Sequence, residues 1–350
     1  MKFCHKIIFS FLFFSFFSNI FFAADIGSDT AVTRYNSQQT VNDGDRIAGF
    51  ASLQGGFKFF DSSVTGTFDS FFPVSGEVDL DGGTLILDRD LVFNDGASIK
   101  QLGNITGQNH CIKLAPSITQ IPLVPSVTAI ILYDVHLILD GNVIFNGAHI
   151  IFGGTSIIDG QGFTLSLGPS FTLGVATDSD LVFRDLEIRG INGNKIQCTD
   201  SLSTISFEDV EWVQDGNFTF TVGKFDVLDD FILEGDGYSF GYETDQVSTV
   251  STYGKIFLDN GFTFHYDPPI VSHVLFDLYA ETSELILNGA TLHSTSTGLI
   301  LETGRLIVDR SSVVSGEGTV DAEAIILASS LDIQQLPAAV LQVEGNVIIE

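Results

Sequence analysis

The sequence predicts an all-β fold, a single-stranded parallel β-helix (β-solenoid) of about ten irregular turns with an N-terminal cap. Two regularities predict it. Tight-turn residue pairs recur every 21 to 28 residues from Asn192 onward, and the turn residues that follow apolar strand triplets recur every 21 to 30 residues, apart from two longer intervals of 52 and 44 residues that we interpret as doubled units. This length fits one turn built from two or three short strands. Apolar residues make up 44% of the chain, so a large core must be buried, and helical periodicity is almost absent.

The turn signal is a dipeptide in which Asp or Asn precedes glycine, a combination that favours tight turns. It recurs along residues 78–350, beginning at Asp81, Asp95, Asp140, Asn146, Asp159, Asn192, Asp215, Asp236, Asn260 and Asn288. The strand signal is an apolar-x-apolar triplet followed by a turn residue, and examples begin at Leu85, Leu137, Leu181, Ile205, Ile256, Leu285 and Leu306. Stacked turns would bury these apolar side chains in ladders spaced by about 4.8 Å.

A local alignment sets the register of this stack. Residues 181–188 align without a gap on residues 205–212. The register places Phe183 directly over Phe207 in the core. This pair is the point on which the predicted architecture depends most directly.

An antiparallel sandwich or barrel is the alternative, because Asn-Gly and Asp-Gly are also strong hairpin signals. It would pair strands across each turn, whereas the solenoid brings positions one period apart into contact. The register supports the solenoid because it stacks Arg184 over Glu208, a favourable cross-strand pair. It also stacks Glu187 over Glu211, which counts against the solenoid unless these side chains splay into water.

The N-terminal segment, residues 1–24, is typical of a signal peptide. Lys2 and Lys6 precede an apolar stretch from Ile7 to Ala24. We therefore expect an exported protein, located in the periplasm, at the cell surface or outside the cell. A retained membrane anchor is the alternative, since eighteen apolar residues are just long enough to span a bilayer.

Residues 25–77 lack the visible repeat and are expected to form an irregular N-terminal cap, followed by the parallel β-helix over residues 78–350. An aromatic cluster in this region would cover the end of the core; it consists of Phe57, Phe59, Phe60, Phe68, Phe71 and Phe72. At the other end the sequence finishes on the strand pattern of residues 347–350. An open edge there predicts end-to-end self-association, or a C-terminal continuation in a longer protein.

The charge balance limits the partners. The chain has 44 acidic and 15 basic residues, a formal net charge of −29. Such a surface repels nucleic acid and anionic membranes, so we expect no nucleic-acid partner and membrane contact only through the N-terminal segment. Carbohydrate or a host or cell-surface protein is the expected partner.

Two cysteines follow the N-terminal segment, Cys111 and Cys198. On the predicted register they lie three to four turns apart, or about 15 Å, which exceeds the limit of roughly 7 Å for a disulfide. We therefore expect two free thiols, and a fold that does not depend on disulfides.

The sequence contains no phosphate-binding loop, nucleophile elbow or metal-ligand spacing, and its histidines are scattered singly. We therefore assign no catalytic residue. One short stretch does resemble a known family: residues 156–162, with the strand at 181–188, resemble the I-D-G-Q-G turn and following strand of pectin-degrading right-handed β-helix proteins.

The resemblance covers about 30 residues and implies a fold more than an activity. Polygalacturonase-like enzymes have N-T-D, G-H-G and R-I-K motifs that this sequence lacks, and the pair Asp229-Asp230 matches only their D-D motif. The irregular repeats of residues 78–350 look more like the non-catalytic passengers of autotransporters, adhesins and surface-layer proteins.

One set of carboxylates is a candidate binding site. The repeat aligns Asp185, Asp209 and Asp230 along one edge of the rod, about 5 Å apart. Carboxylates at this spacing repel each other unless water screens them or a cation lies between them. We therefore expect no cofactor apart from weak Ca²⁺ binding at this ladder.

These observations predict an exported or cell-surface structural or adhesive β-helix that acts through its surface. The alternative is a polysaccharide-active β-helix enzyme, a lyase or glycoside hydrolase, which would need a cluster of Asp, Glu, Arg and His side chains on adjacent turns. A phage-tail or filament component is a third interpretation, and it would form a stable trimer.

Overall fold

A computed structural model describes residues 23–122, 129–147, 149–259, 261–269, 276–278, 280, 282–294, 299–309, 312–316, 319–327 and 340–349. The predicted signal peptide lies almost entirely outside these residues, as does the final residue of the chain. The described residues contain only strands, turns and bends, and they include no helix that could cross a membrane.

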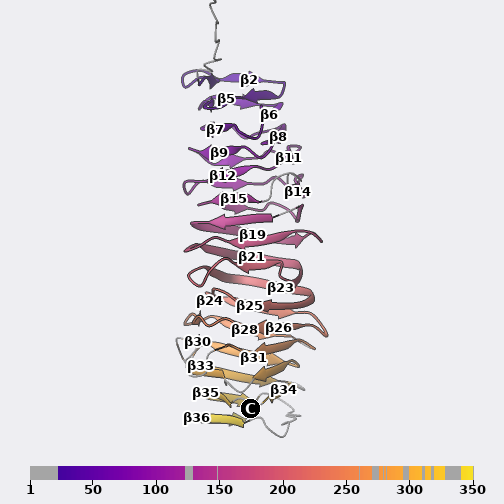
Figure 1. The fold of residues 1–350 in the computed structure, drawn as a ribbon, viewed down its shortest axis with the longest axis vertical. Helices are drawn as coiled ribbons and strands as arrows, with labels where there is room; N and C mark the ends of the chain where they lie inside the picture. The colour runs from indigo at the N-terminus through magenta and orange to yellow at the C-terminus, as the bar shows by residue number, and fades with distance from the viewer. Residues whose placement is uncertain are drawn as a thin grey trace, which may run out of the picture.

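The strands stack into one long rod, and every strand pairing is parallel (Figure 1). The predicted all-β parallel solenoid is therefore confirmed, with about 12 turns where the sequence indicated about ten. Positions one period apart lie beside each other, and no antiparallel pairing occurs in the described part. This arrangement excludes the sandwich or barrel of hairpins.

One side of the rod is a nine-stranded sheet in which each turn contributes one strand. Its strands are β1 (Asp25–Ile26), β4 (Arg46–Ile47), β7 (Thr65–Phe68), β9 (Thr84–Leu87), β12 (Asn104–Thr106), β15 (Ile130–Tyr133), β18 (His149–Gly153), β20 (Thr172–Val175) and β22 (Ile196–Cys198). The strand β22 lies against the last residues of β23 (Thr204–Phe220). From there the same side continues through β26 (Ser239–Tyr242), β29 (Thr263–Tyr266), β32 (Thr291–Ser294) and β34 (Val313–Gly316).

The remaining strands build the other sides of the coil. Long strands turn corners and serve more than one side: β19 (Thr155–Leu167), β21 (Asp180–Gly193), β23, β33 (Leu299–Asp309), β35 (Thr319–Leu327) and β36 (Val340–Ile349). Of these, β23 pairs in turn with β24, β25 and β26. Short strands of later turns are β10 (Leu91–Val92), β13 (Cys111–Lys113), β14 (Gln120–Pro122), β16 (His136–Ile138), β17 (Val143–Asn146), β24 (Lys224–Val227), β25 (Asp230–Glu234), β27 (Ser248–Val250), β28 (Lys255–Leu258), β30 (Phe276–Leu278) and β31 (Glu284–Asn288). Two small sheets complete the first turns: β3 (Gln39–Val41), β6 (Gly56–Phe59), β8 (Glu77–Asp79) and β11 (Ser98–Gln101), and β2 (Thr33–Tyr35) with β5 (Ala51–Leu53).

The core is a single column of stacked apolar side chains. Phe183 pairs with Phe207 as predicted, and their rings stack with centroids 6.1 Å apart at an angle of 16°. Phe207 in turn stacks on Phe231, with centroids 3.9 Å apart. Burial of such side chains removes large apolar areas from water, so these ladders are the main source of stability.

Residues 25–77 contain strands of the same stack, although no repeat is visible in their sequence. Parallel pairing begins at β1, and β4 and β7 connect it to β9. Of the aromatic cluster predicted to act as a cap, three rings are buried in the core (Phe57, Phe59 and Phe68), whereas Phe60 and Phe71 are 70% and 55% exposed.

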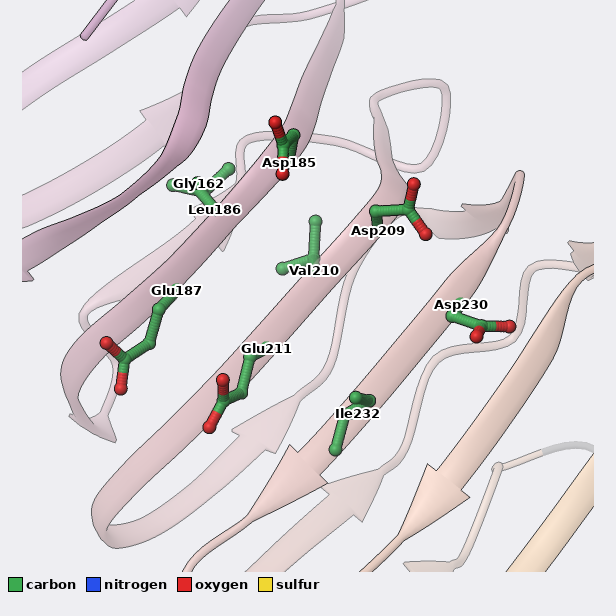
Figure 2. Close-up of a pocket in the computed structure, with 9 residues that line it drawn as sticks. All are labelled: Gly162, Asp185, Leu186, Glu187, Asp209, Val210, Glu211, Asp230 and Ile232. Carbon is green, nitrogen blue, oxygen red and sulfur yellow. The ribbon is translucent and has the colours of Figure 1, made fainter. Parts of the chain in front are cut away.

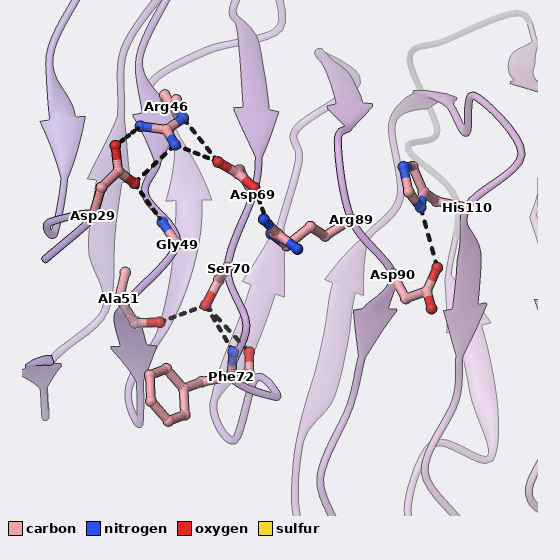
Figure 3. A network of polar contacts seen from close by, with 10 residues as sticks. All are labelled: Asp29, Arg46, Gly49, Ala51, Asp69, Ser70, Phe72, Arg89, Asp90 and His110. Atoms are coloured by element: carbon pink, nitrogen blue, oxygen red, sulfur yellow. Dashed lines mark hydrogen bonds and ion pairs between the residues drawn. The ribbon is translucent and has the colours of Figure 1, made fainter.

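Ion pairs and hydrogen bonds between charged side chains connect these first turns on the surface of the rod. Arg46 contacts Asp29 and Asp69, and Arg89 donates a hydrogen bond of 2.6 Å to Asp69 (Figure 3). The guanidinium of Arg89 also lies 3.6 Å from the centre of the Phe71 ring, so it covers part of that exposed side chain. Because these residues come from successive turns, the network fixes the register of strands that are only two to four residues long.

Candidate functional site

The predicted carboxylate ladder is present at a corner of the coil. On three successive strands, Leu186 pairs with Val210, and Val210 pairs with Phe231. The residues immediately before them are Asp185, Asp209 and Asp230, so these three aspartates lie on successive strands. Figure 2 shows these three side chains one after another along the corner.

The corner geometry explains why two of these residues are aspartates. Asp185 and Asp209 interrupt long strands, and their φ angles are 45° and 56°. Asp is one of the few residues with a side chain that visits this left-handed region readily. One turn earlier the corner is formed by Gln161 and Gly162, also with positive φ.

Five carboxylates line a hollow of about 360 Å³ at this corner, together with Gly162 and apolar strand residues. Besides the three aspartates they are Glu187 and Glu211, which point the same way in Figure 2. The stacking of Glu187 over Glu211 is thus confirmed. Arg189 contacts Glu187 and relieves part of this like-charge repulsion.

Burial and neighbouring charges shift the protonation of these groups. Burial, then the charges of Asp229 and Asp230, raises the pKa of Asp209, and burial followed by Asp229 raises the pKa of Asp230. Burial also acts to raise the pKa of Glu187, but hydrogen bonds from Arg189 and Thr164 outweigh it and lower that pKa. Positive charge therefore offsets repulsion at Glu187, whereas at Asp230 the nearby Lys255 offsets only part of the effect of burial and Asp229.

The ladder as it stands is not a preformed metal centre. Among the described residues, no three His, Cys, Asp or Glu side chains converge as the ligands of one metal ion would. Calcium needs six to eight oxygen ligands, so the carboxylates would have to turn toward a common point. Weak calcium binding stays a prediction.

The nine-stranded side of the rod presents a contrasting surface. None of its strands from β7 to β22 contains Asp, Glu, Lys or Arg, and the same holds for β26, β29, β32 and β34. We call the outward side chains of these eleven strands the uncharged face. Every second residue of each strand points outward, so the face is a set of columns with one side chain per turn.

Hydroxyl, amide, imidazole and apolar groups make up these columns, and the imidazoles are those of His149, His265 and His293. One column runs through Thr67, Ile86, Thr106, Tyr133 and Gly153. A Cβ atom at Gly153 would lie 2.7 Å from the ring of Tyr133, so this glycine lets the ring lie against the next strand. Tyr133 is 47% exposed. The face is thus smooth and includes an accessible aromatic ring.

A hollow of about 240 Å³ opens in the uncharged face between β22 and the end of β23. Its lining is free of ionisable carboxyl, amino and guanidinium groups, and it includes the side chains of Asn194, Gln197, Thr219 and Thr221. Amides and hydroxyls both donate and accept hydrogen bonds. The hollow therefore suits a neutral ligand rich in hydroxyl groups.

The sequence analysis did not identify the uncharged face. Its signal is present in the printed sequence, because the outward residues of the strands on this side are Thr, Ser, Asn, Gln, His, Tyr, Ile, Val or Gly and never Asp, Glu, Lys or Arg. To recognise this signal, each strand triplet must first be assigned to a side of the coil. Periodicity alone does not supply that assignment.

Both predicted thiols are free. Cys198 is buried, and burial, then Asp200, raises its pKa to about 12. Cys111 is partly exposed, and burial, then the charges of Asp90 and Asp159, raises its pKa. The two cysteines lie in different strands, β22 and β13.

No protein-family model, no curated protein and no solved structure matches this chain.

Proposed function

We propose that this chain is an exported β-solenoid that binds an uncharged polysaccharide through the uncharged face, as a structural or adhesive component outside the cytoplasm. The observation behind the proposal is the absence of Asp, Glu, Lys and Arg from eleven strands on one side of a chain with a net charge of −29. Acidic side chains occupy the other sides, where Asp185 and Glu211 lie.

The chemistry of the face suits a neutral glycan. Sugar rings have apolar faces that pack on aromatic and aliphatic side chains, and hydroxyl groups that exchange hydrogen bonds with amides and hydroxyls. Tyr133 and Ile131 are 47% and 46% exposed on this face, and Gln197 and Thr219 line its hollow. An acidic polymer would be repelled by the rest of the rod.

Export is supported by the sequence of the N-terminal segment, in which Lys2 and Lys6 precede the apolar stretch. A structural role outside the cell is consistent with a rod whose long sides are rigid and regularly spaced. In such a role each turn adds one row to the binding surface, so many weak contacts act together.

Binding of the mature chain to insoluble neutral polysaccharides, such as cellulose and chitin, tests the proposal. We expect Tyr133→Asp to weaken binding at least about tenfold, because a carboxylate would be desolvated against an uncharged partner. The matched control is Tyr253→Asp, at a residue that is 72% exposed but outside the face, and it should bind as the unaltered chain does.

Two results would overturn the proposal: equal loss in both tyrosine variants, or binding that disappears with added salt as expected for ion pairing. Binding only to cell-surface protein would identify the other expected partner. Release of reducing ends from the same polysaccharides would support the alternative, an enzyme that uses the carboxylates around Asp209 and Glu211.

A further inference from the structure

A second polar cluster lies outside the uncharged face, on the turns that precede the acidic corner, and Asp159 at its end pairs with Arg184, the neighbour of Asp185. Cys111 in β13 pairs with His136 in β16, and Asp159 in β19 lies diagonally beyond them. The Sγ atom of Cys111 is 3.4 Å from Nδ1 of His136. On the other side of the ring, Nε2 of His136 is 3.6 Å from Oδ2 of Asp159.

The two contacts define how the imidazole is held. Asp159 is 6% exposed, and its Oδ1 accepts hydrogen bonds from the backbone and side-chain nitrogens of Gln161. Its Oδ2 faces Nε2 of His136, a buried atom for which the structure gives no hydrogen bond. In the tautomer with the hydrogen on Nε2, that hydrogen faces the Asp159 carboxylate and Nδ1 offers a lone pair toward Cys111.

We propose that Cys111 and His136 bind a thiophilic transition-metal ion of the zinc class, with Asp159 as the residue that positions the imidazole. In tetrahedral zinc sites the sulfur and nitrogen lie about 2.3 and 2.0 Å from the metal, which places these two ligands about 3.5 Å apart. The observed separation of 3.4 Å is close to that spacing, and the metal would replace the hydrogen bond between the thiol and Nδ1.

Asp159 is the carboxylate that would hold the metal-binding histidine in place. Metal-bound histidines donate their other ring N–H to a carboxylate, which fixes the tautomer and orients the ring. On binding, the metal replaces the thiol proton, which leaves to solvent, and takes the lone pair of Nδ1, while Nε2–H stays directed at Asp159. The negative charges of Asp90 and Asp159 near the thiol attract the incoming cation.

The arrangement does not favour covalent catalysis by the same thiol. Acyl transfer needs hydrogen-bond donors for the oxyanion that forms beside the nucleophile. The backbone N–H of Cys111 instead donates to Oδ1 of Asp90 at 2.9 Å, and that carboxylate would repel an oxyanion. Two protein ligands leave the remaining metal positions to water.

Alkylation of Cys111 by iodoacetamide, followed by mass spectrometry, tests the site in the full mature chain. We expect saturating Zn²⁺ to slow alkylation of Cys111 at least about tenfold, and a chelator to reverse the effect. Mg²⁺ at the same concentration should give no protection, because it avoids thiolates. Cys198 is the internal control, since it is buried and should react only after denaturation.

Three variants separate this site from zinc bound elsewhere on the acidic surface. His136→Ala should abolish the protection. Asp159→Asn should raise the zinc concentration needed for half-protection about 10- to 100-fold. His110→Ala, at the neighbouring histidine that contacts Asp90, should leave protection unchanged. Unchanged alkylation of Cys111 in zinc, or equal protection in His136→Ala, would overturn the proposal.

Discussion

Asp209 combines two properties that act against each other. Its left-handed backbone, with φ of 56°, suits an aspartate at the corner of the coil. Its carboxylate, however, lies in a column with Asp185 and Asp230, and burial together with these charges raises its pKa. The residue that makes the turn also introduces repulsion into the folded state.

This conflict predicts the effect of Asp209→Asn. A carboxyl with a raised pKa in the folded state destabilises that state once pH rises above its unfolded pKa, near 3.9. Asparagine keeps the left-handed geometry and removes the charge, so we expect the melting temperature at pH 7 to rise by about 1 to 3 °C. The gain should vanish at acidic pH, where both chains are uncharged at this position.

Asp178→Asn is the matched control, because Asp178 is also exposed and left-handed, with φ of 51°, but lies outside the ladder. An equal rise in both variants would contradict the explanation. The same melting experiment tests the calcium prediction. Millimolar calcium should stabilise the unaltered chain more than Asp209→Asn, and no shift at all would exclude calcium binding at this corner.

Individual strands of this fold have little stability of their own, since many have two to four residues. Their order comes from contacts between turns, such as those of the Phe207 ring, which lies between the rings of Phe183 and Phe231. Neighbouring turns should therefore depend on one another.

Removal of the middle ring tests this dependence. Phe207→Ala should lower the unfolding free energy by about 3 to 5 kcal/mol, because it leaves a cavity between two turns that cannot collapse onto each other. Chemical denaturation followed by circular dichroism measures the effect. Phe60→Ala is the control, at a side chain that is 70% exposed, and it should change stability little. Similar losses in both variants would contradict the ladder interpretation.

Where two adjacent turns share a long, regular strand pattern, the sequence predicted the structure closely. Residues 181–188 and 205–212 align without gaps, and their pairing, including Arg184 with Glu208 at 2.7 Å, follows the predicted register. Residues 25–77 were harder to predict from the sequence because most of their strands have only two to four residues, too few to give a visible repeat. Contacts between their turns, such as the ion pair of Arg46 with Asp29, cannot be inferred from periodicity.

The candidate sites show the same limit. The ladder of Asp185, Asp209 and Asp230 was predictable because it lies in the regular region. The contact between Cys111 and His136 was not, because the register there passes through irregular turns that lack the aligned pattern. A cysteine and a histidine that are far apart in the sequence can be recognised as neighbours only when the register of their strands is known.

On the scale of the whole molecule, charge is segregated by side. The uncharged face extends along the rod from β7 to β34, while acidic residues gather on the other sides and at the corner with Asp209. This segregation lets a strongly acidic protein approach a neutral surface on one side only. End-to-end association through β36, the last strand of the stack, stays a prediction.

All of these conclusions require that residues about two dozen positions apart lie side by side in parallel. Engineered disulfides test this directly, in a chain with serine in place of Cys111 and Cys198. The pair Glu187→Cys and Glu211→Cys should oxidise readily, because registered parallel neighbours lie about 4.8 Å apart, within disulfide range. The pair Glu187→Cys and Ser206→Cys, which an antiparallel hairpin would bring together, should stay reduced; the opposite result would contradict the stacked architecture.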